Sequence, residues 1–516
     1  MGLAGIDYAI VILYVGGILV IGTYLGRYVR TGKDFFLAGR RLPWWAIGMS
    51  LVVTDIGAKD VIGLAGQAYL FGLVLANFDW LACIPVILIS AFIFVPYYWK
   101  AGVYTVPEWL GLRYNLAVRS IVAVIWGLFL ALNLGVIFSA AAIMFRNLLG
   151  GADRLVAPFW FAPDYQISIY VLATAVIVGT YTFFGGLAAV VLTDAAQMII
   201  MYLGCLAILI FGMASVGGVG EMVSRVKDLG DAYANHFTLF LPADSTSPYA
   251  WPAVIFGLGF VLAPAYWIGN QAIIQRTLGA RSAFDAKAGL IWAAVLKVIV
   301  PVIMVVPGLI ALALPLQLDK GDDAVPTLIR ELLPAGLVGL VFAAFLAALM
   351  GNVDSYLNSA ATLWTRDLYQ RLLVRRASDR HYLVIGRSLT IVFLVIGVLF
   401  APVAETKFSG IFAAMQTLLS MFQGPLLAIL LLGMLWRRTT QWGGLAGLVI
   451  GVGSSAFMFT AKNVLFVIEE PFLYIAWWSF VVGMVVTVVV SLATKREPPE
   501  KLEGLVYGSV MKKVAR

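Results

Sequence analysis

The stretch that decides this fold runs Thr54-Asp55-Ile56-Gly57-Ala58-Lys59-Asp60-Val61-Ile62-Gly63-Leu64-Ala65-Gly66. It lies inside an otherwise apolar segment, residues 43–69, that is long enough to cross a lipid bilayer. Charged side chains within such a segment are costly, because each one costs about 2.5–3.5 kcal/mol at the bilayer centre. The glycines let the helix break, so that backbone carbonyls can leave the helical ladder and face a cavity. We therefore expect a broken, charged membrane helix that forms a functional site.

The composition of the chain is that of a polytopic α-helical membrane protein. Its 516 residues are 62% hydrophobic and 12% charged, with a mean hydropathy of +0.96, which excludes an ordinary soluble protein. Cys83 and Cys205 fall in apolar stretches and predict no disulfide framework. The first apolar stretch lacks a basic leader and a cleavage pattern, so we expect no cleavable signal peptide. We expect about thirteen transmembrane helices, at about 6–26, 43–69, 73–98, 118–145, 165–184, 187–214, 251–271, 285–314, 334–362, 382–401, 409–434, 442–460 and 472–493.

Lysine and arginine residues concentrate in alternate connections between these helices. One set of connections, together with the carboxy-terminal tail, holds 25 of them, including Arg276, and the other set holds eight. The remaining two, Lys59 and Lys297, lie within apolar stretches. The positive-inside rule then predicts a multi-pass protein of the cell (inner) membrane, with its amino terminus outside and its carboxy terminus cytoplasmic. The same bias accounts for the net charge of +8, so we expect no nucleic acid partner. The expected partners are a small-molecule solute and the lipid bilayer.

A second breakable helix appears in the second half of the chain. Residues 263–271 place two aromatic side chains, Tyr266 and Trp267, between a proline and a glycine. Each broken helix begins a run of five predicted spans, which is typical of an inverted-repeat transporter with its site at the membrane midplane. We therefore divide the chain into a peripheral first helix with a basic loop, a first repeat, an external connection, a second repeat, and two peripheral helices with a tail: 1–42, 43–214, 215–250, 251–434 and 435–516.

Five stretches distributed along the chain resemble the solute:sodium symporter family, and within it the sodium/glucose cotransporter branch. They are Tyr104–Glu108, Gly185–Gln197, Asn270–Arg276, Leu357–Tyr369 and Leu432–Thr439. The resemblance covers almost the whole chain. It implies an all-α, leucine-transporter-type fold with ten core helices in two inverted repeats, and it implies sodium as the coupling ion.

The resemblance also implies a set of solute ligands. The family's sugar-branch residues are matched by Asn133, Tyr266, Trp267, Lys297 and Gln416. Asp79 lies where that branch has a glutamate, and Asp60 lies where it has a histidine or glutamine that touches the sugar. Amides, carboxylates and an aromatic face suit a ligand rich in hydroxyl groups, so a sugar or polyol is the expected solute. A small organic anion held by Lys59 and Lys297 is the alternative.

The ion-binding positions depart from the family pattern. Carried over by resemblance, the sodium ligands are the carbonyls of Val53, Ile56 and Ala348, with Gly351 and Asn352 in place of two hydroxyl residues. Three further residues lie where some members bind a second ion: Asp194, Asp354 and Ser355.

Several of these polar residues have a structural alternative. Asp55 and Lys59 are four residues apart and can form a simple intrahelical pair. Alternatively, they can act in coupling and gating, with Lys59 as a surrogate cation in a proton-coupled or ion-independent carrier. Asn133 can join helices, Asp194 can tie them together, and Lys297 can reach the membrane interface. A non-transporting solute sensor is a further alternative. An enzyme is not expected, since no nucleophile–histidine or metal-ligand pattern lies in the spans.

Overall fold

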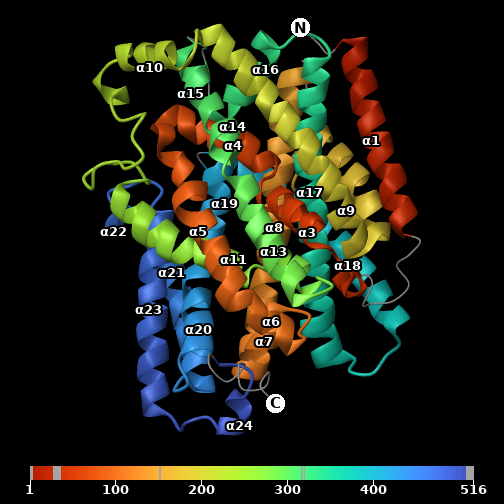
Figure 1. Cartoon of the computed structure of the whole chain (residues 1–516), viewed down its shortest axis with the longest axis vertical. Coiled ribbons are helices and arrows are strands. Elements are labelled where there is room, and N and C mark those ends of the chain that lie inside the picture. The colour runs from red at the N-terminus through yellow and green to blue at the C-terminus, as the bar shows by residue number, and fades with distance from the viewer. Residues whose placement is uncertain are drawn as a thin grey trace.

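The computed structural model describes residues 4–26, 36–149, 153–314, 316, 318, 320–408 and 410–506. Over these residues the protein is a bundle of helices that run mainly along its long axis (Figure 1). One short antiparallel hairpin, β1 (Leu155–Val156) with β2 (Ile167–Ser168), lies among the connections. Six basic residues that contribute to the predicted orientation lie outside the described residues: Arg27, Arg30, Lys33, Lys512, Lys513 and Arg516.

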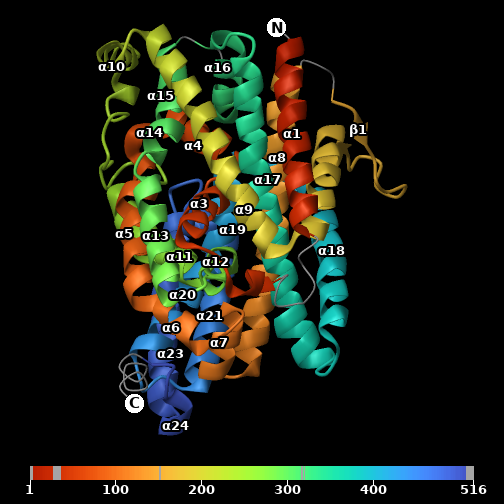
Figure 2. The same cartoon turned by 45° about the vertical axis from the view of Figure 1, so that its right-hand side comes forward.

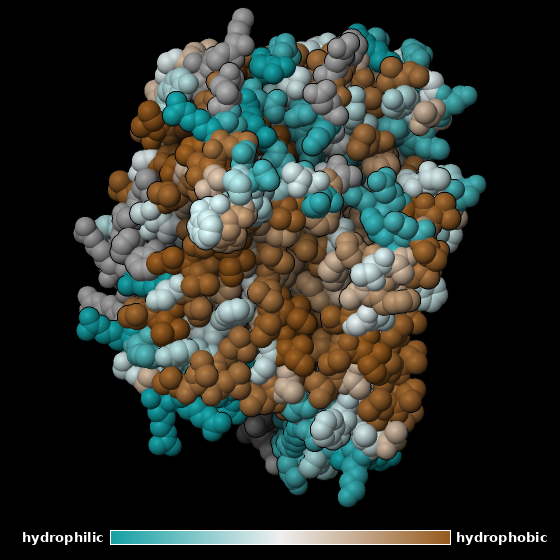
Figure 3. Space-filling view, turned by 180° about the vertical axis from the view of Figure 1, so that it is seen from behind, coloured by the Kyte–Doolittle hydropathy of each residue, from teal (hydrophilic) through white to brown (hydrophobic). Residues whose placement is uncertain are grey.

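The helices are long and apolar enough for a multi-pass membrane protein. Among the described residues, seven helices can cross a membrane by length and composition, or ten when each bent pair counts as one span. Two shorter apolar helices, Gly5–Ile18 and Ile169–Thr180, match two more of the predicted stretches, and the helical run 58–99 covers parts of two others. The surface carries a broad hydrophobic belt between more hydrophilic ends (Figure 3), as a bilayer requires.

The first predicted break is confirmed. Helix α3 (Trp44–Asp55) ends where Ile56 and Gly57 become extended, and α4 (Ala58–Phe71) starts directly afterwards. The carboxylate of Asp60 accepts a hydrogen bond from the Gly57 backbone N–H at 2.8 Å, which caps the start of α4. Beyond α4, Gly72 has a φ of 84° and turns the chain into the next helical run.

The second predicted break is also confirmed. A π-helical segment, η6 (Ala253–Leu262), continues into α11 (Ala263–Gly269), and Asn270 is extended before α12 (Gln271–Leu278). The Asn270 side chain accepts a hydrogen bond from the Ala272 N–H at 2.9 Å, so it caps α12, and the two parts are bent by 46°. Two other spans bend by 45° and 44°, between α13 (Ala283–Lys297) and the pair α14 (Val300–Met304) and α15 (Val306–Ala313), and between α19 (Ile411–Ser420) and α20 (Gln423–Leu435).

Long helices surround the two broken ones. Helix α17 (Leu337–Leu363) packs along α9 (Ile169–Val216), and α18 (Asp379–Lys407) packs along α8 (Leu116–Leu149). At the periphery, α1 (Gly5–Gly26) lies against α9 and α17, and α21 (Gln441–Thr460) pairs with α23 (Phe472–Ala493) (Figures 1 and 2). The run after α4 comprises η2 (Gly72–Phe78), η3 (Asp79–Cys83), α5 (Ile84–Ile89), η4 (Ser90–Phe94) and α6 (Val95–Ala101). The connecting elements are η1 (Ala38–Arg40), α7 (Val106–Arg113), α10 (Val219–Asp228), η5 (Asp231–Tyr233), η7 (Gly321–Asp323), α16 (Ala324–Leu332), η8 (Trp364–Leu373), α22 (Lys462–Leu465) and α24 (Pro499–Leu502).

The predicted spans 165–184 and 187–214 are joined without a helix break, because α9 is helical from Ile169 to Val216. Residues 181–190 contain no proline, so no backbone N–H is removed from the helical ladder. The two arms of α9 nevertheless pack on different helices. Gly179 lies against Leu394 of α18, whereas Gly212 lies against Ile310 of α15.

Candidate functional site

The two broken helices enclose a cavity near the middle of the bundle. Its walls come from the end of α3, the start of α4, η2, η3, η6, α11, α13, α19 and α20. The cavity has a volume of about 70 Å³, which is room for several water molecules. Five of the seven predicted solute ligands line it: Asp60, Asp79, Tyr266, Lys297 and Gln416.

Five charged side chains line this cavity and pair with one another. Lys297 contacts the carboxylates of both Asp55 and Asp79, with its Nζ 2.6 Å from Asp79 Oδ1. Lys59 pairs instead with the neighbouring Asp60. The alternative of an Asp55–Lys59 side-chain pair is therefore wrong, because the Asp55 carboxylate is bound to Lys297 from another helix.

The position of Lys297 follows from this pairing. Its side chain is only 1% exposed, so it does not reach the membrane interface. An ammonium group buried in apolar surroundings is stable only with charged or hydrogen-bonding partners, and here two carboxylates supply them. Its Nζ also lies 5.8 Å from the centre of the Trp267 ring, a cation–π distance. Trp267 thus acts on the cavity through Lys297 and does not line it.

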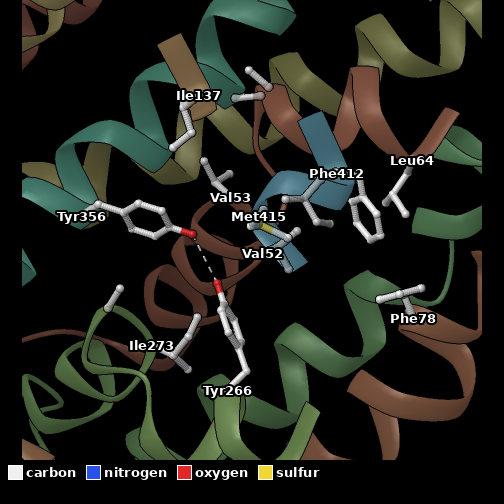
Figure 4. Close-up of a cluster of buried hydrophobic side chains, with 14 of the residues drawn as sticks. Val52, Val53, Leu64, Phe78, Ile137, Tyr266, Ile273, Tyr356, Phe412 and Met415 are labelled. Atoms are coloured by element: carbon white, nitrogen blue, oxygen red, sulfur yellow. Dashed lines mark hydrogen bonds between the residues drawn. The ribbon is translucent and has the colours of Figure 1, made fainter. Parts of the chain in front are cut away.

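Aromatic side chains of α11, η2 and α19 line the cavity. The hydroxyl groups of Tyr266 and Tyr356 point toward one another from α11 and α17, with 3.5 Å between the oxygens (Figure 4). Phe78 and Phe412 meet edge to face with their ring centres 4.9 Å apart. Tyr266, Phe78 and Phe412 thus add ring surface to a lining that also holds charged and amide groups.

The predicted sodium position contains an amide. Asn352 donates through Nδ2 to the carbonyl oxygens of Val53 at 2.7 Å and Thr54 at 3.0 Å. Gly351 has no room for a larger side chain, because an added Cβ would lie 2.2 Å from Val53 Cγ1. The sodium-ligand role predicted for Val53, Ile56, Ala348 and Asn352 stays a prediction.

The predicted second ion position contains an arginine. Asp194 is fully buried, and its Oδ2 lies 3.2 Å from Arg276 Nη2 and accepts a hydrogen bond from Ser50 at 2.5 Å. Arg276 also donates to Ser355, which in turn lies 3.2 Å from Asp354. Arg276 was counted among the basic residues of the connections, and that assignment is wrong, since its side chain is fully buried. A guanidinium therefore supplies positive charge at this position.

Asn133, predicted as a solute ligand, does not line the cavity, whereas Gln423, which was not predicted, does. Asn133 is fully buried in α8 and is not among the residues that line the cavity, and neither of its amide atoms has a hydrogen-bond partner among the described residues. Gln423 does line the cavity, and both of its amide atoms also lack partners in the described part of the chain. Gln416 lies in α19 and Gln423 begins α20, so the two amides come from opposite sides of the 44° bend in this span.

These features define a class of protein. A membrane-spanning bundle with two broken helices around a closed, charged cavity is the architecture of a secondary transporter.

The comparisons agree with this class. The model of the "Sodium:solute symporter family" matches residues 35–451. The chain is 31% identical to the "Sodium/glucose cotransporter" of Vibrio parahaemolyticus, covering 96% of this chain and 91% of the relative. It is also 31% identical to the human "Sodium/myo-inositol cotransporter 2", covering 87% of this chain and 70% of the relative. A solved Na+-coupled sialic acid symporter shares the fold, with a TM-score of 0.80 at 21% identity over 96% of this chain and 99% of that one. Mhp1, a nucleobase-cation-symport-1 family transporter, is more distant, with a TM-score of 0.54 at 13% identity, 91% of this chain and 97% of that one.

The chain belongs to the sodium:solute symporter family. It has the leucine-transporter-type fold expected from the sequence, and it is a secondary transporter whose coupling ion is sodium.

Proposed function

We propose that this protein carries a sugar or polyol across the membrane together with sodium, and that the solute binds in the cavity between the two broken helices. The observation that supports this most directly is the lining of the cavity. Gln416 and Gln423 offer amide donors and acceptors, and Asp60 and Asp79 offer carboxylate acceptors beside the ring of Tyr266. Hydroxyl groups both donate and accept, so a polyhydroxylated ring matches such a lining.

The charges argue against the organic-anion alternative. Both ammonium groups at the cavity, Lys59 and Lys297, are already paired with carboxylates. With all five groups ionised, the three carboxylates exceed the two ammonium groups by one negative charge. An anionic solute would meet net repulsion there, whereas a neutral solute accompanied by a cation would not.

The names of the relatives support the same solute class. Relatives that cover most of the chain are named for sodium with glucose and for sodium with myo-inositol. Both solutes are six-membered rings that carry several hydroxyl groups. We also propose the arrangement in which the amino terminus lies outside and the carboxy terminus lies in the cytoplasm, with repeats at 43–214 and 251–434 and no enzymatic activity.

Uptake into proteoliposomes tests the proposal. Labelled glucose and labelled myo-inositol are each offered to vesicles with an inward sodium gradient, and choline replaces sodium in the matched control. We expect at least one of the two solutes to accumulate, and accumulation to fall to the protein-free level in choline. Absence of uptake for both solutes, or equal uptake in both salts, contradicts the proposal. Solute binding without accumulation supports the sensor alternative.

A further inference from the structure

The carboxy-terminal end of α3 has all of its free carbonyl groups satisfied by other parts of this chain. The last four carbonyls of any helix have no partner within the helix. In α3 these belong to residues 52–55, and the Val52 carbonyl accepts from the Ile56 N–H at 2.8 Å. The other three point into the helix break. Inside a membrane an unsatisfied carbonyl is costly, because no bulk water is present to bind it.

Asn352 of α17 satisfies two of the three. Its Nδ2 donates to the carbonyls of Val53 and Thr54, at 2.7 and 3.0 Å, and its side chain is fully buried. Carbonyl oxygens can only accept hydrogen bonds, so the amide must turn its NH2 group toward them. Two convergent carbonyls around one positively polarised group form the arrangement that would otherwise bind a small cation.

Lys59 satisfies the third. Its ammonium group donates to the Asp55 carbonyl at 3.2 Å while it pairs with the Asp60 carboxylate. The carboxy-terminal end of a helix carries partial negative charge, so a cation is favoured at this point. Asp60 in turn caps the start of α4. One chain of contacts thus joins both halves of the broken helix.

Two glycines hold the amide of Asn352 in this place. A Cβ at Gly57 would lie 2.0 Å from Asn352 Oδ1, and a Cβ at Gly351 would lie 2.2 Å from Val53 Cγ1. A side chain at Gly57 would displace the Asn352 amide, and a side chain at Gly351 would displace the Val53 side chain. The absence of side chains at Gly57 and Gly351 therefore leaves the space that the Asn352 amide occupies in the break.

We propose that Asn352 and Lys59 form an internal cap on α3, which occupies with donors of this chain the position where the broken helix would otherwise bind a cation. One consequence of this cap rests on the proposed function: the sodium ion that drives solute uptake acts at a position other than this break. Removing the cap creates a new requirement for sodium at the break.

Thermal unfolding without solute tests the cap. The full-length purified protein is unfolded in sodium chloride and in choline chloride at equal ionic strength, as the parent and as Asn352→Ala, Asn352→Asp and the matched control Ser139→Ala. Ser139 is a buried residue of α8 whose hydroxyl donates to the Ala401 carbonyl at 2.7 Å, so its loss removes a buried hydrogen bond away from the break. No solute is added, so the result does not depend on which solute is transported or on whether any is.

We expect both Asn352 variants to be less stable than the parent in choline and to recover in sodium. Asn352→Asp keeps the shape of the side chain but replaces the donor by a carboxylate oxygen, so its half-maximal sodium concentration should be at least about tenfold below that of any sodium response of the parent. Ser139→Ala should lose stability equally in both salts.

A sodium response of Asn352→Ala that is equal to or smaller than that of the parent overturns the proposal, because Asn352 would then be a sodium ligand or unrelated to sodium. Failure of both Asn352 variants to fold in either salt also overturns it, since sodium should replace the lost donor. If the cap is supported and uptake of both sugars fails, only the proposed function is rejected.

Discussion

Replacing Lys297 by methionine tests the charge network that lines the cavity. Lys297 is 1% exposed and is shared between Asp55 and Asp79, which lie at the end of α3 and in η3. Methionine keeps much of the length and apolar volume of the side chain but removes the charge. Two carboxylates then face the cavity without their cation.

The expected loss in free energy of unfolding follows from breaking a buried ion pair. Removing one partner of such a pair costs about 3–5 kcal/mol, because the other charge is left without compensation. Changing Asp79 to asparagine in the same chain removes one of the two stranded carboxylates. The double variant Lys297→Met with Asp79→Asn should therefore be more stable than Lys297→Met alone.

The assay is thermal unfolding of the purified protein, together with sodium-driven solute uptake into vesicles. We expect Lys297→Met to have a clearly lower unfolding midpoint and little uptake, and the double variant to regain part of the midpoint only. Lys287→Met, at a basic residue of the same helix that does not line the cavity, is the matched control. A Lys297→Met protein as stable and active as the parent would refute the reasoning.

Three further predictions concern single residues. Gln423→Leu should weaken solute binding about fivefold, since one hydrogen bond contributes about 1 kcal/mol, while the unfolding midpoint stays near that of the parent. Unchanged affinity in a binding titration would exclude contact with the solute. Arg276→Gln should lower the free energy of unfolding by about 3–5 kcal/mol, because it leaves the buried Asp194 carboxylate without its cation. Asp194→Asn in the same chain should restore part of the unfolding midpoint, and additive losses would contradict a direct pair. Asp322, in the connection before α16, is 7% exposed, and burial raises its pKa to about 6, although its carboxylate accepts a hydrogen bond from the Ile411 N–H at 2.9 Å. Its folded pKa lies above the ordinary value of about 3.9, so its contribution to stability is complete below about pH 4 and is lost as the pH rises through about 6, a change of up to about 3 kcal/mol. Asp322→Asn should lack this part of the pH dependence in unfolding measurements between pH 4 and 7, and an identical slope would contradict the assignment.

The sequence by itself determined the membrane architecture and the places where its helices break. Long apolar stretches leave no other fold class, because backbone groups in a bilayer must be bonded within helices. The break at Gly57 follows from a glycine whose N–H is capped by the carboxylate of Asp60, three positions later. The break at Asn270 follows from its own capping amide. These are local interactions between residues two or three positions apart, so they can be recognised in the sequence.

The tertiary structure alone decided which groups pair. Asp55 and Lys59 are four positions apart in the sequence, yet the Asp55 carboxylate binds Lys297, which is 242 positions away. Arg276 resembles a basic loop residue in the sequence, but the packing of α3, α9, α12 and α17 buries it against Asp194. Asn352 lies 299 positions from the carbonyl that it binds. Such pairs depend on the distances between helices, which local periodicity does not specify. The contacts of Asp55 and Asn352 also hold together the break between α3 and α4.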